Sequence, residues 1–279
     1  MIARTGDLVD AAAAGGTAVV AFNVITVEHA EAIVTGLERA GRPGVLQLSE
    51  NAVRFHGSMA PVLAACVELA AAAGVPVAVH LDHFQDADLT REGLRLSARL
   101  DVSSVMVDAA HLPDAQNLAT TAERARDAHA VGLWVEAELG EVGGKGGAHT
   151  PGVRTDPAQA KDFVAATRVD ALAVAVGSEH AMTTADAALD LDLVDRLAVA
   201  VPVPLVLHGS SGVPVPTLAA AVAAGIRKVN VGTALNVAYT GAVRAWLAQD
   251  ERGVDPRRYL RGARDAMADV VAELVAALA

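Results

Sequence analysis

Short apolar runs alternate with longer alanine-rich stretches along the whole chain. The apolar runs are rich in β-branched residues and are continuous rather than alternating, which is typical of parallel strands buried on both faces. The expected strands are residues 17–23, 44–48, 75–82, 103–108, 133–138, 171–176, 203–208 and 226–231. The stretches between them fit helices, for example residues 28–40, 59–73, 114–131, 157–167, 215–224 and 233–249.

Eight strands with helical connections, in a chain of 279 residues, match a TIM (β/α)8 barrel in size and count. An open, doubly wound sheet is the competing α/β fold. No G-x-G-x-x-G segment follows the first strand, where the dinucleotide site of that fold would lie. No Ser-, Gly- or Pro-rich linker divides the chain, and residues 255–279 fit one extra helix. We therefore expect a single domain over residues 1–279, a TIM barrel with an extra C-terminal helix.

The composition restricts the class of protein further. Hydrophobic residues make up 53% of the chain, which is enough for a large core and unlike a disordered chain. The 22 basic and 33 acidic residues give a net charge of −11, which disfavours nucleic acid as a partner. The single cysteine, Cys66, allows no intrachain disulfide and no thiolate zinc cluster. The N-terminus lacks an apolar run behind a basic start, and Glu68 interrupts the apolar stretch 61–79, so we expect a cytoplasmic protein with no membrane partner.

Polar residues collect where the expected strands end, and barrel enzymes place their chemistry at the C-terminal ends of the strands. His83, His180 and His208 follow the third, sixth and seventh strands, so the barrel would bring them together. Three imidazoles with an open fourth position form a catalytic zinc site. The alternative is that each is an ordinary hydrogen-bonded or capping histidine.

Three carboxylates lie near these histidines in the expected fold. Asp82 precedes His83 and is a candidate general acid/base beside a metal, or else orients a histidine or caps the next helix. Asp108 and Glu138 are candidates for holding a second metal or supporting the first. Their alternative role is a buried ion pair with Lys228 or Arg227.

Two Gly/Ser turns follow the last two strands, at residues 209–212 and 230–233, where barrels commonly bind phosphate through backbone N–H groups. They can equally be simple turns. The glycine-rich segment 143–147 fits either a lid over the substrate or an ordinary surface loop. Arg257 and Arg258 in the tail fit a second phosphate, a neighbouring subunit or a solvated helix face.

Four segments in this order, HLDH at 80–83, VEAELG at 135–140, LVLHGSSG at 205–212 and KVNVGT at 228–233, resemble the class II, zinc-dependent ketose-bisphosphate aldolases. That family includes fructose- and tagatose-bisphosphate aldolases, and the resemblance runs from residues 21–23 to the tail. It implies a TIM barrel, a catalytic Zn²⁺, and reversible cleavage of a phosphorylated ketose to dihydroxyacetone phosphate and an aldehyde. A second divalent or a monovalent cation is an additional candidate, and a homodimer or homotetramer is expected.

By motif position, His83, His180 and His208 match the zinc ligands, and Asp82 matches the acid/base that acts on the C4 hydroxyl. Asp108 and Glu138 match carboxylates that hold a second metal in some members. Arg257 matches an arginine that binds the distal phosphate of an adjoining subunit's substrate. The full set of candidate substrate- and phosphate-binding residues is Asn23, Ser49, Ala181, Gly209, Ser210, Ser211, Asn230, Val231, Gly232, Thr233 and Arg257.

The chain departs from the family pattern in two places. Gly146 and Gly147 stand where the family has a Glu-Asp pair whose glutamate moves the C3 proton, and Ala181 stands where it generally has glycine. Glu141 and His149 are candidate substitutes for the missing carboxylate, and we expect poor turnover of fructose-1,6-bisphosphate. Three hypotheses remain open: a zinc aldolase acting on a ketose phosphate, another zinc-barrel reaction such as epimerisation or hydrolysis, and a non-catalytic sugar-phosphate or metal binder.

Overall fold

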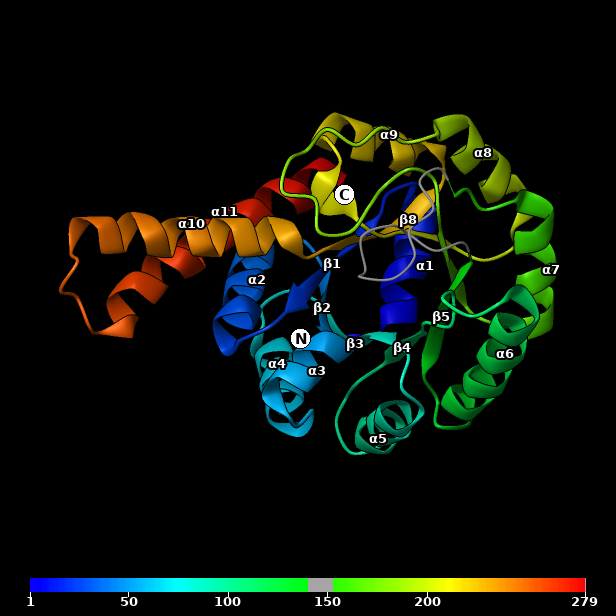
Figure 1. The fold of residues 1–279 in the computed structure, drawn as a ribbon, viewed down its shortest axis with the longest axis horizontal. Helices are drawn as coiled ribbons and strands as arrows, with labels where there is room; N and C mark the ends of the chain where they lie inside the picture. Colours follow the sequence, from blue (N-terminus) through cyan, green and yellow to red (C-terminus); the bar gives the residue numbers. More distant parts are fainter. Residues whose placement is uncertain (140–152, 279) are drawn as a thin grey trace.

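The computed structural model describes residues 1–139 and 153–278 as a closed barrel in which eight parallel strands pair in chain order, β1 to β8. Figure 1 shows helices arranged around this barrel. The expected fold class, a TIM barrel with an extra C-terminal helix, is confirmed. The strands are β1 Val19–Val24, β2 Gly44–Ser49, β3 Val77–Phe84, β4 Ser104–Val107, β5 Trp134–Leu139, β6 Ala171–Val174, β7 Leu205–Leu207 and β8 Ile226–Val231.

Each strand begins and ends within two residues of its expected bounds. The helices that the sequence analysis named are all present, within one residue at each end. They are α2 Val27–Ala40, α4 Ala60–Ala72, α6 Asp114–Ala130, α7 Pro157–Thr167, α9 Val215–Ala224, α10 Thr233–Gln249 and α11 Pro256–Leu278. The structure adds helices at α1 Thr5–Gly15, α3 Glu50–His56, α5 Ala87–Ser97 and α8 Leu191–Ala200, and a 3₁₀ turn at Ser210–Gly212. The glycine-rich segment 143–147, with Glu141 and His149, lies outside the described residues.

Helix α1 closes the N-terminal end of the barrel. Its Val9 packs with Val19, Ala21, Val45 and Ala78, which form a small apolar cluster on the lower inner surface of the first three strands. In Figure 1, α1 lies within the circle of strands rather than in the outer ring of helices. The barrel interior beneath the first three strands is therefore apolar, whereas Thr5 of α1 makes buried hydrogen bonds to Ser103 and Ser104 at the start of β4.

The C-terminal helix α11 pairs with α10 and packs on α2, and Figure 1 shows α10 and α11 extending beyond the ring of helices. A Cβ added to Gly36 on α2 would lie 2.6 Å from the Ala268 carbonyl oxygen, so the absence of a side chain at Gly36 permits the close approach of α2 and α11. Among the described helices, no single one has the length and apolarity to cross a membrane. The pair α3 and α4 passes that test only when taken together across a 120° bend.

Candidate active site and metal centre

Alternate residues on each strand face the barrel interior, because the side chains of a strand alternate between its two faces. Polar residues two apart therefore lie one above the other inside the barrel, as His80 and Asp82 do on β3 and Lys228 and Asn230 do on β8. At the carboxyl ends of the strands the interior opens into a cleft of about 730 Å³. The candidate residues that line it are Asn23, Ser49, Asp82, His83, Asp108, Glu138, His180, Ala181, His208, Gly209, Ser211, Asn230, Gly232 and Thr233.

A bulge at the end of β3 places two successive side chains at this cleft. Between Leu81 and Phe84 the pairing with β4 shifts by one residue, and His83 has a φ of 54°, in the left-handed region that few non-glycine residues adopt. In a regular strand Asp82 and His83 would point to opposite faces. The bulge turns both side chains toward the cleft. A candidate base and a candidate ligand that are adjacent in the sequence therefore face the same site, and the backbone at His83 is strained.

The three histidines predicted as metal ligands converge. His83, His180 and His208 each offer one ring nitrogen, and these three atoms lie within 4.8 Å of one another. Gly209, which follows His208, has a φ of 66°, and a Cβ there would lie 2.6 Å from the backbone carbonyl of Glu179. A glycine at this position thus lets the segment that carries His180 pack directly against the segment that carries His208.

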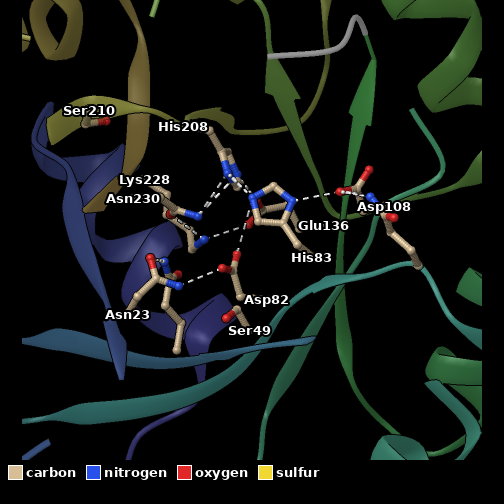
Figure 2. Close-up of polar contacts among 12 residues, drawn as sticks. Asn23, Ser49, Asp82, His83, Asp108, Glu136, His208, Ser210, Lys228 and Asn230 are labelled. Atoms are coloured by element: carbon tan, nitrogen blue, oxygen red, sulfur yellow. Dashed lines mark hydrogen bonds and ion pairs between the residues drawn. The ribbon is translucent and has the colours of Figure 1, made fainter. Parts of the chain in front are cut away.

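Carboxylates fix the tautomers of two of these imidazoles. Asp108 Oδ2 lies 2.9 Å from His83 Nδ1, and Glu136 Oε1 lies 2.7 Å from His208 Nε2. An ionised carboxylate only accepts hydrogen bonds, so each holds the proton of its histidine on the nitrogen that faces it. These nitrogens are Nδ1 of His83 and Nε2 of His208. His83 Nε2 and His208 Nδ1, which are 2.9 Å apart, then present lone pairs to each other (Figure 2). A bound metal cation relieves that repulsion, so the donor set fits a metal ion.

Asp82 is held at the inner edge of the same group. The Asn23 side-chain amide donates to its Oδ2 at 2.8 Å, and Gln47 donates in turn to Asn23 Oδ1 at 3.0 Å. Asp82 Oδ1 makes no hydrogen bond with the described residues and lies 3.8 Å from His83 Nε2. Burial favours the neutral acid, but electrostatic interactions of the carboxylate with its neighbours, His83 first and the Lys228 ammonium among them, outweigh burial and lower its pKa. The structure therefore holds an ionised carboxylate with one oxygen directed at the imidazoles.

The buried ion pair beneath the site differs from the one considered in the sequence analysis. Lys228 Nζ pairs with Glu136 Oε2 at 2.8 Å, not with Asp108 or Glu138, and both partners have no exposed surface. The Arg227 guanidinium donates to backbone carbonyls instead. Burial alone would raise the pKa of Glu136, but Lys228 and His208 hold it well below its usual value.

The two Gly/Ser turns meet at the start of α10. The Ser211 hydroxyl accepts a hydrogen bond from the Ala234 N–H at 3.0 Å, and Gly232, the residue before the helix, supplies no side-chain cap. The first turn of this 17-residue helix borders the cleft through Thr233. Backbone N–H groups at such an N-terminus favour an anion.

Three of the candidate residues are not among those that line the cleft. The Ser210 hydroxyl is buried and donates to the Leu207 carbonyl oxygen, and Val231 is buried in the apolar layer outside the barrel. Arg257 lies in the α10–α11 hairpin, where it pairs with Asp255 at 2.8 Å and is 85% exposed. Arg257 is therefore not among the residues that border the cleft of its own subunit.

Sequence reasoning did not assign Gln47, His80, Glu136 or Lys228 to the site, although all four are fully buried inside the barrel. Burial lowers the pKa of His80 to about 3, so this histidine is neutral, and its Nδ1 lies 2.8 Å from the Ser104 hydroxyl. The spacing of polar residues could have identified them. Polar residues two apart within an apolar strand share one face, and in a barrel covered by helices that face is the interior.

The closed parallel barrel with three imidazoles converging at its mouth defines a barrel protein with a candidate metal centre. The family model for class II fructose-bisphosphate aldolase matches residues 3–279. The chain is 30% identical to the YdjI aldolase from Escherichia coli K12, with a TM-score of 0.85 over 100% of this chain and 97% of that one. A Coccidioides immitis protein provisionally assigned as a fructose-1,6-biphosphate aldolase is 27% identical, with a TM-score of 0.88 over 99% and 96%.

A fructose-bisphosphate aldolase from Campylobacter jejuni shares the fold at 20% identity, with a TM-score of 0.79 over 99% of this chain and 95% of that one. The chain belongs to the class II fructose-bisphosphate aldolase family and is an aldolase, a carbon–carbon lyase. Members of this family act on sugar phosphates and generally depend on a metal ion. The resemblance drawn from the four sequence segments is confirmed at the level of the family.

Proposed function

We propose that this protein is a zinc-dependent aldolase that reversibly cleaves a ketose-1,6-bisphosphate or related ketose-1-phosphate to dihydroxyacetone phosphate and an aldehyde. The observation that carries the proposal is the convergence of His83, His180 and His208 beside the directed oxygen of Asp82. Neutral imidazoles are ligands that Zn²⁺ prefers, and three of them leave one position open for substrate. When bound, zinc supplies Lewis-acid stabilisation of the negative charge that develops on substrate oxygens as the carbon–carbon bond breaks.

Asp82 supplies the proton transfer. Its Oδ2 accepts from the Asn23 amide, whereas Oδ1 is directed at the imidazoles and makes no hydrogen bond with the described residues. In the cleavage direction Oδ1 takes the proton from the C4 hydroxyl, and it returns that proton in the condensation direction. A carboxyl with a lowered pKa is ionised at neutral pH, which is the state that this role requires.

The first turn of α10 and the loop after β7 form the proposed phosphate site. Gly209, Ser211, Gly232 and Thr233 border the cleft at this point, and the chain's net charge of −11 does not oppose the assignment, since backbone N–H groups supply the attraction locally. Asn23, Ser49, Ala181 and Asn230 complete the proposed substrate contacts. Ser49 also caps α3 by accepting from the Ala52 N–H at 3.2 Å.

The remaining assignments rest on membership of the aldolase family and, for Arg257, on the exposure of its side chain. Asp108 and Glu138 border the cleft and are proposed to support zinc or to hold a second divalent or a monovalent cation. Arg257, exposed on the projecting hairpin, is proposed to reach the substrate of an adjoining subunit in a homodimer or homotetramer. Residues 1–279 are proposed to form one domain. Cytoplasmic location stays a prediction.

The deciding experiment is a cleavage screen of the zinc-loaded protein over fructose-1,6-bisphosphate, tagatose-1,6-bisphosphate and ketose-1-phosphates, with detection of triose phosphate. Zinc content of wild type and His208→Ala is measured in parallel. Cleavage by wild type together with zinc loss in the variant is expected. Epimerisation or hydrolysis without carbon–carbon cleavage, or binding without turnover, would replace the proposed reaction, and full zinc occupancy in His208→Ala would overturn the ligand assignment.

The glycines at 146 and 147 shape the expected substrate range. With no carboxylate at these positions, proton delivery to C3 of the product is impaired, so fructose-1,6-bisphosphate is expected to be a poor substrate, slowed by ~10²–10⁴-fold. The double variant Gly146→Glu/Gly147→Asp tests this by steady-state kinetics. A large gain is expected. Wild-type turnover of this sugar at about 10 s⁻¹ would contradict the expectation.

A further inference from the structure

A buried chain of charged and polar groups runs under the metal centre and ends on two residues of the site. Lys228 Nζ donates to Glu136 Oε2 at 2.8 Å and to Asn230 Oδ1 at 2.7 Å, and Glu136 Oε1 accepts from His208 Nε2 at 2.7 Å (Figure 2). Lys228, Glu136 and His208 have no exposed surface. Every contact in the chain is within ordinary hydrogen-bond distance, so each group constrains the next.

The orientation of Glu136 decides which nitrogen of His208 is available to a metal. One carboxylate oxygen faces the Lys228 ammonium, which can only donate, and the other faces His208. His208 must therefore carry its proton on Nε2 and direct the lone pair of Nδ1 toward His83 Nε2, 2.9 Å away. The opposite tautomer would place a proton where the metal belongs.

We propose that Glu136, held in place by Lys228, is a positioning residue that sets the tautomer of His208 and thereby the metal affinity of the centre. This inference rests on the proposed metal-dependent function. Lys228 also orients a second group, because its contact with Asn230 Oδ1 turns the Asn230 amide NH₂ toward His208, at 3.4 Å from the Nδ1 that carries the lone pair. A buried ion pair by itself is weak evidence of stabilisation. A pair that served only to fill the barrel would not require Glu136 and Asn230 to be oriented toward His208.

The variant Glu136→Gln tests the orientation most directly. With Lys228 present, the amide oxygen must face the ammonium, so the amide NH₂ faces His208 and donates to Nε2. His208 is then forced to carry its proton on Nδ1. We expect zinc affinity, measured by competition with a chromophoric chelator, to fall by ~10–100-fold. Ring-nitrogen NMR of the metal-free, ¹⁵N-histidine-labelled variant should show His208 protonated on Nδ1, with a His208→Gln spectrum used for assignment.

Glu136→Gln leaves the buried Lys228 ammonium without its carboxylate partner. Two double variants avoid this, because each removes the ammonium and the carboxylate together. Glu136→Gln/Lys228→Met frees the amide to turn its oxygen to His208 Nε2, whereas Glu136→Met/Lys228→Met offers no acceptor. The two proteins carry the same charge and side chains of similar size. We expect the first to bind zinc ~10-fold more tightly than the second and to keep the proton on Nε2.

Arg227→Met is the matched control, since Arg227 neighbours Lys228 but, within the described part of the chain, its guanidinium donates only to the backbone carbonyls of Val222 and Ile226. It should bind zinc as wild type does. Equal zinc affinities for the two double variants, or an unchanged His208 tautomer and affinity in Glu136→Gln, would overturn the inference while leaving the proposed function intact. Failure of wild type and Arg227→Met to bind zinc would instead contradict the proposed metal centre, and with it the inference.

Discussion

The barrel wall of this protein has two faces of opposite character. Its outer face, packed against the helices, is a continuous apolar layer in which Phe22, Leu46, Leu81 and Val107 are all fully buried. Its inner face carries two small apolar clusters, one around Val9 of α1 and one around Met106 of β4, and is polar toward the mouth, where side chains are paired one by one. Non-directional burial stabilises the outer layer, whereas the inner one depends on specific donors and acceptors. Substitutions in the two layers should therefore damage different properties.

The largest expected effect comes from the inner face. Asp82→Asn keeps the shape of the side chain and the contact with Asn23 but removes the ability to take a proton. Turnover should fall by ~10²–10⁴-fold while zinc content stays near that of wild type. Steady-state kinetics and elemental analysis of the same preparation check both. Near-normal cleavage by the zinc-loaded variant would remove Asp82 from the mechanism.

The outer layer should show the reverse pattern. Leu63 on α4 is fully buried among apolar side chains, and Leu63→Ala removes apolar contact and leaves a cavity. We expect a loss of about 2–5 kcal/mol in the free energy of unfolding, measured by urea denaturation. Zinc affinity and turnover of the folded fraction should not change. A large loss of zinc affinity at unchanged stability would show that the two faces are coupled.

Cys66 adds a pH test of the outer layer. Burial raises the pKa of its thiol to about 12 from a value of 9.0. The folded state therefore keeps a proton that the unfolded state loses between these values, so this contribution to stability is complete below about pH 9 and is lost as the pH rises toward 12. The expected slope is at most about 1.4 kcal/mol per pH unit.

The measurement for Cys66 is the difference in unfolding free energy between wild type and Cys66→Ala at pH 8 and pH 10. Wild type should lose more of its stability over this interval than the variant does. The thiol should also resist alkylation in the folded protein at pH 8. Rapid modification of the folded protein, or identical pH profiles for the two proteins, would show that the thiol is accessible.

The smallest expected effect concerns the backbone next to His180. Ala181 has a φ of 61°, in the left-handed region that favours glycine. Ala181→Gly relieves about 1–2 kcal/mol of strain and adds roughly 0.5–1 kcal/mol of conformational entropy to the unfolded state. We expect a net gain of about 0–1.5 kcal/mol, seen as a higher denaturation midpoint. Ala173→Gly, in the extended strand β6, is the control and should destabilise.

The regular framework could be predicted from the chain alone, because strand and helix periods depend on local spacing of apolar residues. The strand at Ile226–Val231 and the helices at Pro157–Thr167, Val215–Ala224 and Thr233–Gln249 begin and end as expected. The helix at Thr5–Gly15 was not expected. That helix precedes the first strand, so the strand-then-helix rhythm does not predict it, and its buried side pairs with the inside of the barrel.

The candidate ligands could also be predicted, since a closed barrel brings all strand ends to one mouth, wherever they lie in the sequence. The sequence alone thus determined the eight strands, most of the helices between them, the fold they build and which histidines meet. Only the tertiary structure decided how these groups are held: the bulge that turns Asp82 and His83 to the same side, and the pairing of Lys228 with Glu136 rather than with Asp108 or Glu138. The physical reason is that hydrogen bonds depend on distance and direction between strands far apart in the sequence, and no local pattern encodes these.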